Sequence, residues 1–124
     1  MRIVITDKVL REGRQLAASI ERLLPDADVL LYDDSHEALV GIAEHRPDVV
    51  FVAPTVGALA GPEFVSQVVD VHGLDATVVG VVDEPDADWS QRYVAAGAHV
   101  VVQRPVDELG LRVAMRQRAG GIPG

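Results

Sequence analysis

The apolar positions of this chain follow two different spacings in turn, and this alternation predicts five strand–helix pairs. The central stretch, residues 49–53, holds five apolar residues without a break between Asp48 and Pro54. Such an unbroken run is typical of a strand that is buried on both faces of a parallel sheet. Similar signals predict the other four strands at residues 2–6, 27–32, 77–82 and 99–103.

Between these strands, apolar residues recur at helical spacing and predict five helices. The helices are expected at residues 9–24, 35–46, from 62 onward, 86–96 and 106–119. Pro25 and Gly97 should end the first and fourth helices, and Ser35 should cap the second. The expected buried sides consist of Leu10, Gly13, Ala17, Ile20 and Leu24; Leu39, Ile42 and Ala43; Phe64, Val68 and Val71; and Val106, Leu109 and Val113.

Five successive strand–helix units with right-handed connections predict an open, doubly wound parallel sheet. In such sheets a site lies beyond the carboxyl ends of the strands. We therefore expect the ends of the first, third and fourth strands and the Arg104-Pro105 turn to share one crevice. Residues 1–119 are predicted to form one domain, and residues 120–124 are interpreted as a flexible tail or the start of a linker.

Composition narrows the possible chemistry. The chain has 124 residues, a formal net charge of −8 and no cysteine, which excludes disulfides, thiolate metal sites and a cysteine nucleophile. A nucleic-acid backbone would be repelled by this charge, and no apolar run is long enough to span a membrane. The chain opens directly into a strand, which favours a cytoplasmic protein.

The histidines are scattered, and the serines and glycines lie in no hydrolase or nucleotide-binding motif, so we predict no metal, no cofactor and no catalytic activity.

Four short motifs carry a family resemblance. They are His45-Arg46-Pro47-Asp48-Val49-Val50, Gly61-Pro62-Glu63, Ala95-Ala96-Gly97-Ala98 and Arg104-Pro105. In this order and at these spacings they resemble the receiver domain of bacterial response regulators, from Arg2 to about Ala119. The resemblance implies a flavodoxin-like (βα)5 fold with strand order 2-1-3-4-5, and a proline after the last strand, here Pro105, that is commonly cis.

Receivers accept a phosphoryl group on an aspartate that follows the third strand. That chemistry needs a nucleophile and cations that neutralise the developing charge. The resemblance places Ala53 at the aspartate position, Val82 at the hydroxyl position and Arg104 at the lysine position. The aromatic position of the last strand falls on Val101. These substitutions predict a pseudo-receiver that is not phosphorylated.

The acidic pair that binds Mg²⁺ in receivers is also incomplete. It aligns with Asp7-Lys8 or with Thr6-Asp7, so a single carboxylate remains in either case. One hypothesis is that Arg104 or Lys8 pairs with Asp7 and fixes one conformation without a metal. The alternative is that Asp7 caps the first helix while Arg104 points to solvent.

Several residues are candidates for a partner-binding surface. Trp89 and Tyr93 are one helical turn apart and form either a surface hot spot or part of the core. Leu111 and Met115 are expected to lie opposite the buried stripe of the last helix, beside Arg112, and so to contact a partner. The acidic run Asp83, Glu84, Asp86 and Asp88 either attracts a basic partner or is a solvated loop.

Two functions from different classes remain. The first is a non-enzymatic, phosphorylation-independent signalling module that contacts a protein partner or a second copy of itself through the fourth helix, last strand and last helix. The alternative is a small-molecule sensor whose ligand fills the crevice left by Ala53, Val82 and Gly57.

Overall fold

The computed structural model describes residues 1–84 and 86–120, with side chains described as far as Arg116. Its main sheet has five parallel strands in the order β2-β1-β3-β6-β7, which is the predicted order 2-1-3-4-5 of a flavodoxin-like fold. The strands are β1 (Arg2–Thr6), β2 (Asp28–Tyr32), β3 (Val49–Val52), β6 (Thr77–Val82) and β7 (Val100–Gln103). The helices are α1 (Leu10–Leu23), α2 (Ser35–His45), α3 (Gly61–Val69), α4 (Ala87–Ala96) and α5 (Glu108–Gly120).

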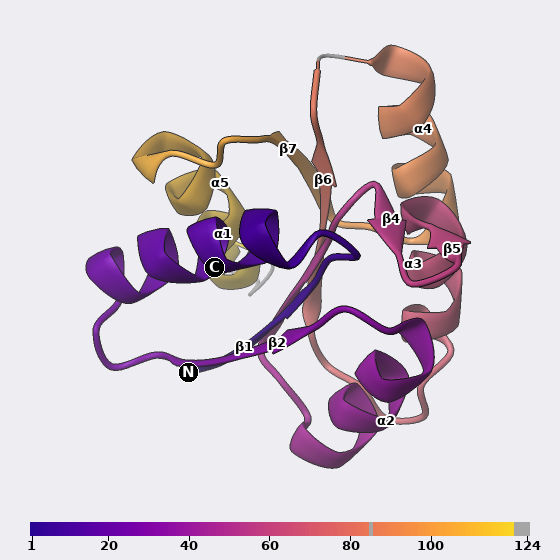
Figure 1. Ribbon diagram of the computed structural model, residues 1–124, viewed down its shortest axis with the longest axis horizontal. Helices are drawn as coiled ribbons and strands as arrows, with labels where there is room; N and C mark the ends of the chain where they lie inside the picture. The colour runs from indigo at the N-terminus through magenta and orange to yellow at the C-terminus, as the bar shows by residue number, and fades with distance from the viewer. Residues whose placement is uncertain (85, 121–124) are drawn as a thin grey trace.

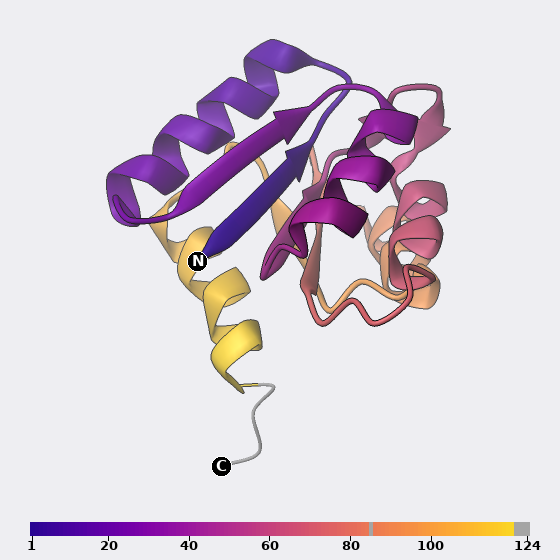
Figure 2. The same cartoon turned by 90° about the horizontal axis from the view of Figure 1, so that it is seen from below.

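The helices form a layer on each face of the sheet. Helices α1 and α5 cover one face, and α2, α3 and α4 cover the other (Figure 1). Seen from below, α5 runs past the amino ends of the strands and leads away from the sheet (Figure 2). The carboxyl ends of the strands thus lie at the edge opposite to the end of α5.

Each central strand contributes side chains to both layers. In β3, Val50 and Val52 face α2–α4, whereas Val49 and Phe51 face α1 and α5, and all four side chains are fully buried. This explains the unbroken apolar run of the sequence, because a strand covered on both faces has no polar side.

The predicted helix ends are largely confirmed, with one correction. Gly97 adopts a left-handed conformation, φ 118°, at the end of α4, as predicted. The cap of α2 is Asp34 rather than Ser35, because an Asp34 carboxylate oxygen accepts a hydrogen bond from the backbone N–H of Glu37 at 2.8 Å. The inward placement of Ala43 is also wrong, since Ala38 and Gly41 are the residues buried beside Ile42.

The apolar stripe predicted for the last helix is wrong. We expected Leu109 and Val113 to face the sheet and Leu111 and Met115 to face away. Leu111 is only 3% exposed and Met115 packs against the same core cluster, whereas Leu109 is 69% exposed. Val113 also lies at the surface, with 36% of its area exposed.

The physical reason for this error lies at the start of α5. Asp107 accepts a hydrogen bond from the backbone N–H of Gly110 at 2.8 Å, as a residue that caps a helix does. Val106 is buried but precedes this cap, so it does not share the helical phase of the residues that follow. A stripe counted from Val106 therefore selects the outer side of α5.

Two connections at the carboxyl edge have defined conformations. The segment after β3 forms a hairpin of β4 (Thr55–Val56) and β5 (Leu59–Ala60). The Arg104-Pro105 peptide bond is cis, as the resemblance implied. Helix α5 includes Gly120, and the rest of the predicted tail, residues 121–124, lies outside the described residues.

Candidate functional site

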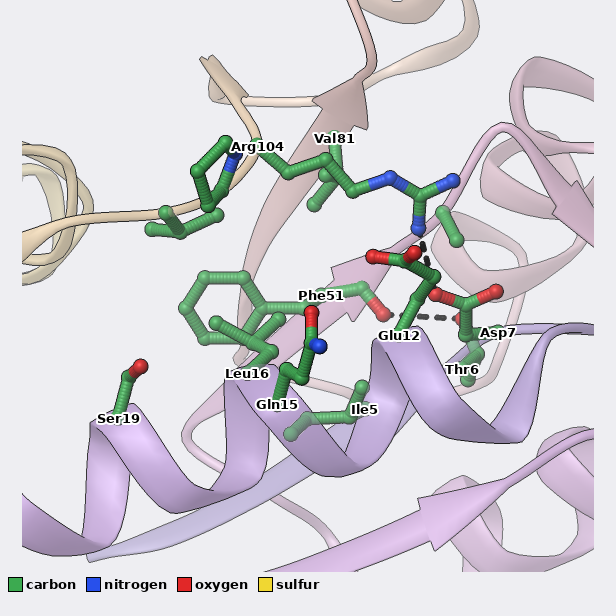
Figure 3. Close-up of a pocket in the computed structure, with 13 residues that line it drawn as sticks. Ile5, Thr6, Asp7, Glu12, Gln15, Leu16, Ser19, Phe51, Val81 and Arg104 are labelled. Carbon is green, nitrogen blue, oxygen red and sulfur yellow. Dashed lines mark hydrogen bonds and ion pairs between the residues drawn. The ribbon is translucent and has the colours of Figure 1, made fainter.

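Asp7, Ala53 and Arg104 meet at the carboxyl edge of the sheet, whereas Val82 and Gly57, which were also expected at the crevice, do not line the cavity there. The backbone N–H of Ala53 donates to the carbonyl of Thr6 at 3.0 Å, and that of Arg104 donates to the carbonyl of Val82 at 2.8 Å. These bonds extend the strand pairing by one residue and place Asp7, Ala53 and Arg104 beside the same cavity (Figure 3). The side chain of Lys8 is exposed and forms no ion pair with any described residue.

Asp7 and Arg104 form the predicted ion pair. The guanidinium Nη1 of Arg104 lies 2.8 Å from a carboxylate oxygen of Asp7, and the two side chains are 17% and 5% exposed. The other carboxylate oxygen of Asp7 accepts a hydrogen bond from the backbone N–H of Val9 at 2.9 Å, just before α1 begins. The alternative is therefore wrong on both points, because Arg104 does not point to solvent and the N-cap of α1 is Val9, with no side-chain hydrogen bond at the cap.

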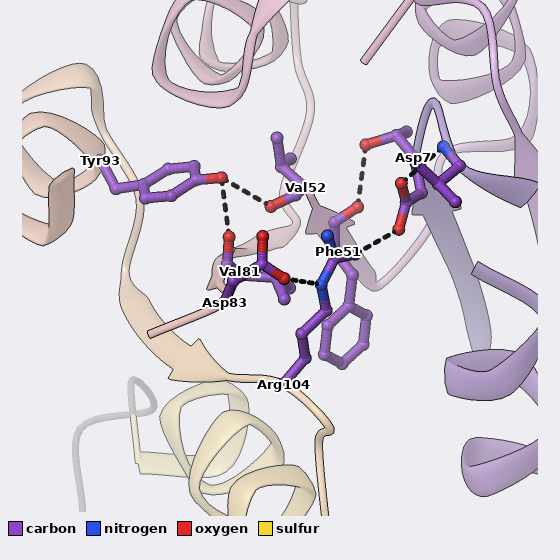
Figure 4. A network of polar contacts seen from close by, with 9 residues as sticks. Asp7, Phe51, Val52, Val81, Asp83, Tyr93 and Arg104 are labelled. Atoms are coloured by element: carbon purple, nitrogen blue, oxygen red, sulfur yellow. Dashed lines mark hydrogen bonds and ion pairs between the residues drawn. The ribbon is translucent and has the colours of Figure 1, made fainter. Parts of the chain in front are cut away.

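A second carboxylate, which the sequence did not single out for this role, completes the network. The Nε of Arg104 donates to a carboxylate oxygen of Asp83, the residue that follows β6. Figure 4 shows the guanidinium of Arg104 lying between Asp7 and Asp83. The cation thus links the ends of β1, β6 and β7 across the crevice.

Burial and charge act in opposite directions on this network. Burial raises the pKa of the Asp7 carboxyl, and the Val9 hydrogen bond and the Arg104 guanidinium, which lower this pKa, do not fully offset it. Burial lowers the pKa of Arg104, but the hydrogen bond to Asp83 and the charge of Asp7 outweigh it, so this pKa is raised. Arg104 therefore stays a permanent cation.

On the other face of the same edge, Tyr93 fills the space beside β3 and β6. Its side chain is fully buried, and its hydroxyl oxygen lies 3.0 Å from the carbonyl oxygens of both Val52 and Val81. If Gly80 were replaced by a residue with a side chain, its Cβ would lie 2.6 Å from the Tyr93 ring. A Cβ at position 61 would clash with the Tyr93 hydroxyl. Burial raises the pKa of this hydroxyl far above its ordinary value.

Trp89 and Tyr93, which were expected to form either a surface hot spot or part of the core, lie in different environments. Tyr93 belongs to the core and is not available as a surface hot spot. Trp89 is half-buried, packs edge-on against Tyr93 with ring centroids 6.4 Å apart, and is covered by the guanidinium of Arg92 at 4.3 Å. Gly80, a glycine within the valine-rich strand β6, is the sequence signal that could have indicated that the Tyr93 ring packs there.

The candidate partner residues do not form one surface. Leu111 and Met115 lie on the inner side of α5, as described above, and Arg112 lies on its outer side in an ion pair with Glu108 at 2.6 Å. Of the acidic run, Asp83 binds Arg104, and Asp86 caps α4 by accepting from the backbone N–H of Trp89 at 3.0 Å. The run is therefore partly structural.

The described part of the chain offers no metal centre. Across residues 1–84 and 86–120, no group of three or more histidine, aspartate or glutamate side chains is arranged to hold a metal ion. Nor is any helix in these ranges long and apolar enough to cross a membrane.

No family model matches the sequence, and no curated protein matches it at a significant level. Solved structures match it closely in shape. A two-component response regulator from Clostridium difficile is 14% identical over 100% of this chain and 99% of its own, with a TM-score of 0.84. The signal receiver domain of a DNA-binding response regulator from Colwellia psychrerythraea is 19% identical over 97% and 98%, also with a TM-score of 0.84.

A response regulator receiver domain protein from Methanospirillum hungatei gives a TM-score of 0.81 at 16% identity, over 97% of this chain and 94% of its own. At this level of identity the comparisons establish the fold. The chain has the receiver-domain fold, with Ala53 directly after the third strand of the sheet.

Proposed function

We propose that this chain is a receiver-like signalling module that works without phosphorylation, through contact with a protein partner or with a second copy of itself. The observation that carries the proposal is the network around Arg104. A methyl group, Ala53, stands where receivers carry the phospho-acceptor, and beside it the guanidinium bridges Asp7 and Asp83. A guanidinium built into the chain supplies the positive charge that a bound cation would otherwise bring.

Phosphoryl transfer from acetyl phosphate tests the first half of the proposal. After incubation with acetyl phosphate and Mg²⁺, the intact mass of the protein should not change, and a conventional receiver in the same buffer serves as the positive control. The Ala53→Asp variant should also gain no mass, because Val82 and Arg104 still replace the hydroxyl and the lysine of the reaction. A phosphoryl group on the unmodified chain would disprove the proposal.

The contact surface that we propose combines β7 with the outer side of α5. Here Leu109 and Val113 line an open groove together with Val101 and Pro105, and β7 is an edge strand of the sheet. Exposed apolar side chains beside an unpaired strand edge are common features of protein contacts. Leu109 and Val113 take the role that the sequence had assigned to Leu111 and Met115.

A photo-crosslinking residue at position 109 tests this surface in cells. It should form an adduct with a second copy or with one other protein, and sedimentation of the purified chain distinguishes the two. Position 40, on α2, is a matched control because Val40 is also exposed, at 43%, but lies on the opposite layer. Equal adducts at both positions, or none at position 109, would contradict the proposed surface.

The second candidate, a small-molecule sensor, is favoured by one further observation. The crevice next to Ala53 continues into a cavity between α1 and the turn at Arg104 and Pro105. A ligand held there would contact both α1 and the turn that leads into α5.

A further inference from the structure

The cavity between α1 and the cis-proline turn has an apolar floor. Leu16, Phe51 and Val106 line it, and Phe51 is fully buried beneath it (Figure 3). It offers about 50 Å³ to the centres of water-sized molecules. Because one water needs about 10–15 Å³ on this measure, the cavity has room for a group of a few heavy atoms.

The rim of the cavity is polar along α1. Glu12, Gln15 and Ser19 follow one another at helical spacing and all line it. Glu12 forms no ion pair or hydrogen bond with any residue that the structure describes. Its charge acts on Arg104 and Asp7 without a direct contact, so its carboxylate remains open to a polar group in the cavity.

The charges around the cavity favour one class of ligand. Asp7 and Glu12 give the cavity lining two carboxylates against the one guanidinium of Arg104, and Arg104 already binds Asp7 and, outside the lining, Asp83. An anion would meet an excess of negative charge, whereas a cation could bind the Glu12 carboxylate directly. The apolar floor next to Glu12 suits a short hydrocarbon chain attached to that cation.

We propose that this cavity binds a small primary amine, with its ammonium group at Glu12 and its hydrocarbon chain on Leu16, Phe51 and Val106. The inference rests on the sensor candidate and adds the chemical class of its ligand. It goes beyond the sequence hypothesis, which placed a ligand at Ala53, Val82 and Gly57, because the cavity lies on the α1 and α5 side of the sheet.

Butylamine, butanol and butyrate form a matched series that tests the proposal, since they share a hydrocarbon chain and differ in charge. Binding is followed by titration of the backbone amide signals of Leu16 and Val106 in nuclear magnetic resonance spectra of the 124-residue chain. Butylamine should bind more tightly than butanol, and butyrate most weakly. Ammonium chloride at equal ionic strength should not shift these signals, which separates the cavity from general attraction to an acidic protein.

Two variants and one control sharpen the test. Glu12→Gln should weaken butylamine binding about threefold, as for a partly exposed charge pair, and should remove its advantage over butanol. Ser19→Leu should fill one end of the cavity and weaken butylamine and butanol alike. Glu21→Gln, an exposed acid on the same helix away from the cavity, should change nothing.

The outcomes separate the inference from the sensor candidate. Equal binding of the three compounds, or a preference for butyrate, would overturn the assignment of an amine as the ligand. The sensor candidate would then still stand, because the cavity would bind a small molecule. If none of the compounds bound at any concentration at which the protein stays folded, the sensor candidate would fail together with the inference.

Discussion

The two sides of the sheet close its carboxyl edge by different means. On the α4 side, the ring of Tyr93 packs on Gly80, and its hydroxyl reaches the ends of β3 and β6. On the α1 and α5 side, the contact is ionic, and Arg104 joins Asp7 and Asp83 above a cavity. Close packing fixes one shape, whereas an ion network beside a cavity leaves room for a ligand. We infer that the α4 side supplies stability and that the α1 side is where the molecule can respond.

The largest expected effect is on the packed side. Tyr93→Ala should lower the free energy of unfolding by about 3–5 kcal/mol, because it leaves a cavity over Gly80 and removes the hydroxyl proton that two strand carbonyls share. Tyr93→Phe, which removes only the hydroxyl, should lower it by about 1–2 kcal/mol. Denaturant titration measures both values. If Tyr93→Ala lowered the free energy of unfolding by less than about 1 kcal/mol, the α4 side would not be the side that supplies stability.

A second, smaller effect tests the corrected phase of α5. Leu111→Ala should lower the free energy of unfolding by about 2–3 kcal/mol, since Leu111 is buried between α5 and the sheet. Leu109→Ala is the matched control and should change it by less than about 0.5 kcal/mol, because its side chain is mostly exposed. Equal losses in the two variants would show that the outer side of α5 is also packed.

The smallest effect concerns the ionic side. Because the pKa of Asp7 is raised, its carboxyl group binds a proton more tightly in the folded chain than in the unfolded chain, where the ordinary value is 3.8. Asp7 thus contributes most to stability below about pH 4, and its contribution declines as the pH rises through the raised pKa. The unfolding free energy of the wild type minus that of Asp7→Asn should therefore fall as the pH rises from 3 to 7.

Denaturant titrations of both proteins between pH 3 and pH 7 measure this difference, and titration of the other acids cancels in the comparison. If the difference grew with pH instead, the ion pair with Arg104 would be a net source of stability. The ionic side would then resemble the packed side in its effect on folding.

The sequence pattern predicted five strand–helix units and the run before Ala53 as β3, because these depend on local spacing. The strand order came from the family resemblance, and the pair of Arg104 with Asp7 was one of two hypotheses that the sequence left open. The orientation of Tyr93 was left open because it depends on Gly80 and Gly61, which are distant in sequence. The phase of α5 was wrong because a buried residue before the cap at Asp107 was counted as helical.

The guanidinium of Arg104 has one further consequence, because it is covalently part of the chain. A bound metal ion dissociates when its concentration falls, whereas a tethered cation keeps a constant local concentration beside Asp7. If the chain works without phosphorylation, as we propose, the arrangement at this edge would not respond to the supply of magnesium or of energy-rich phosphate donors. For a module that acts by protein contact alone, the strength of the output would then follow the number of copies that the cell makes and degrades.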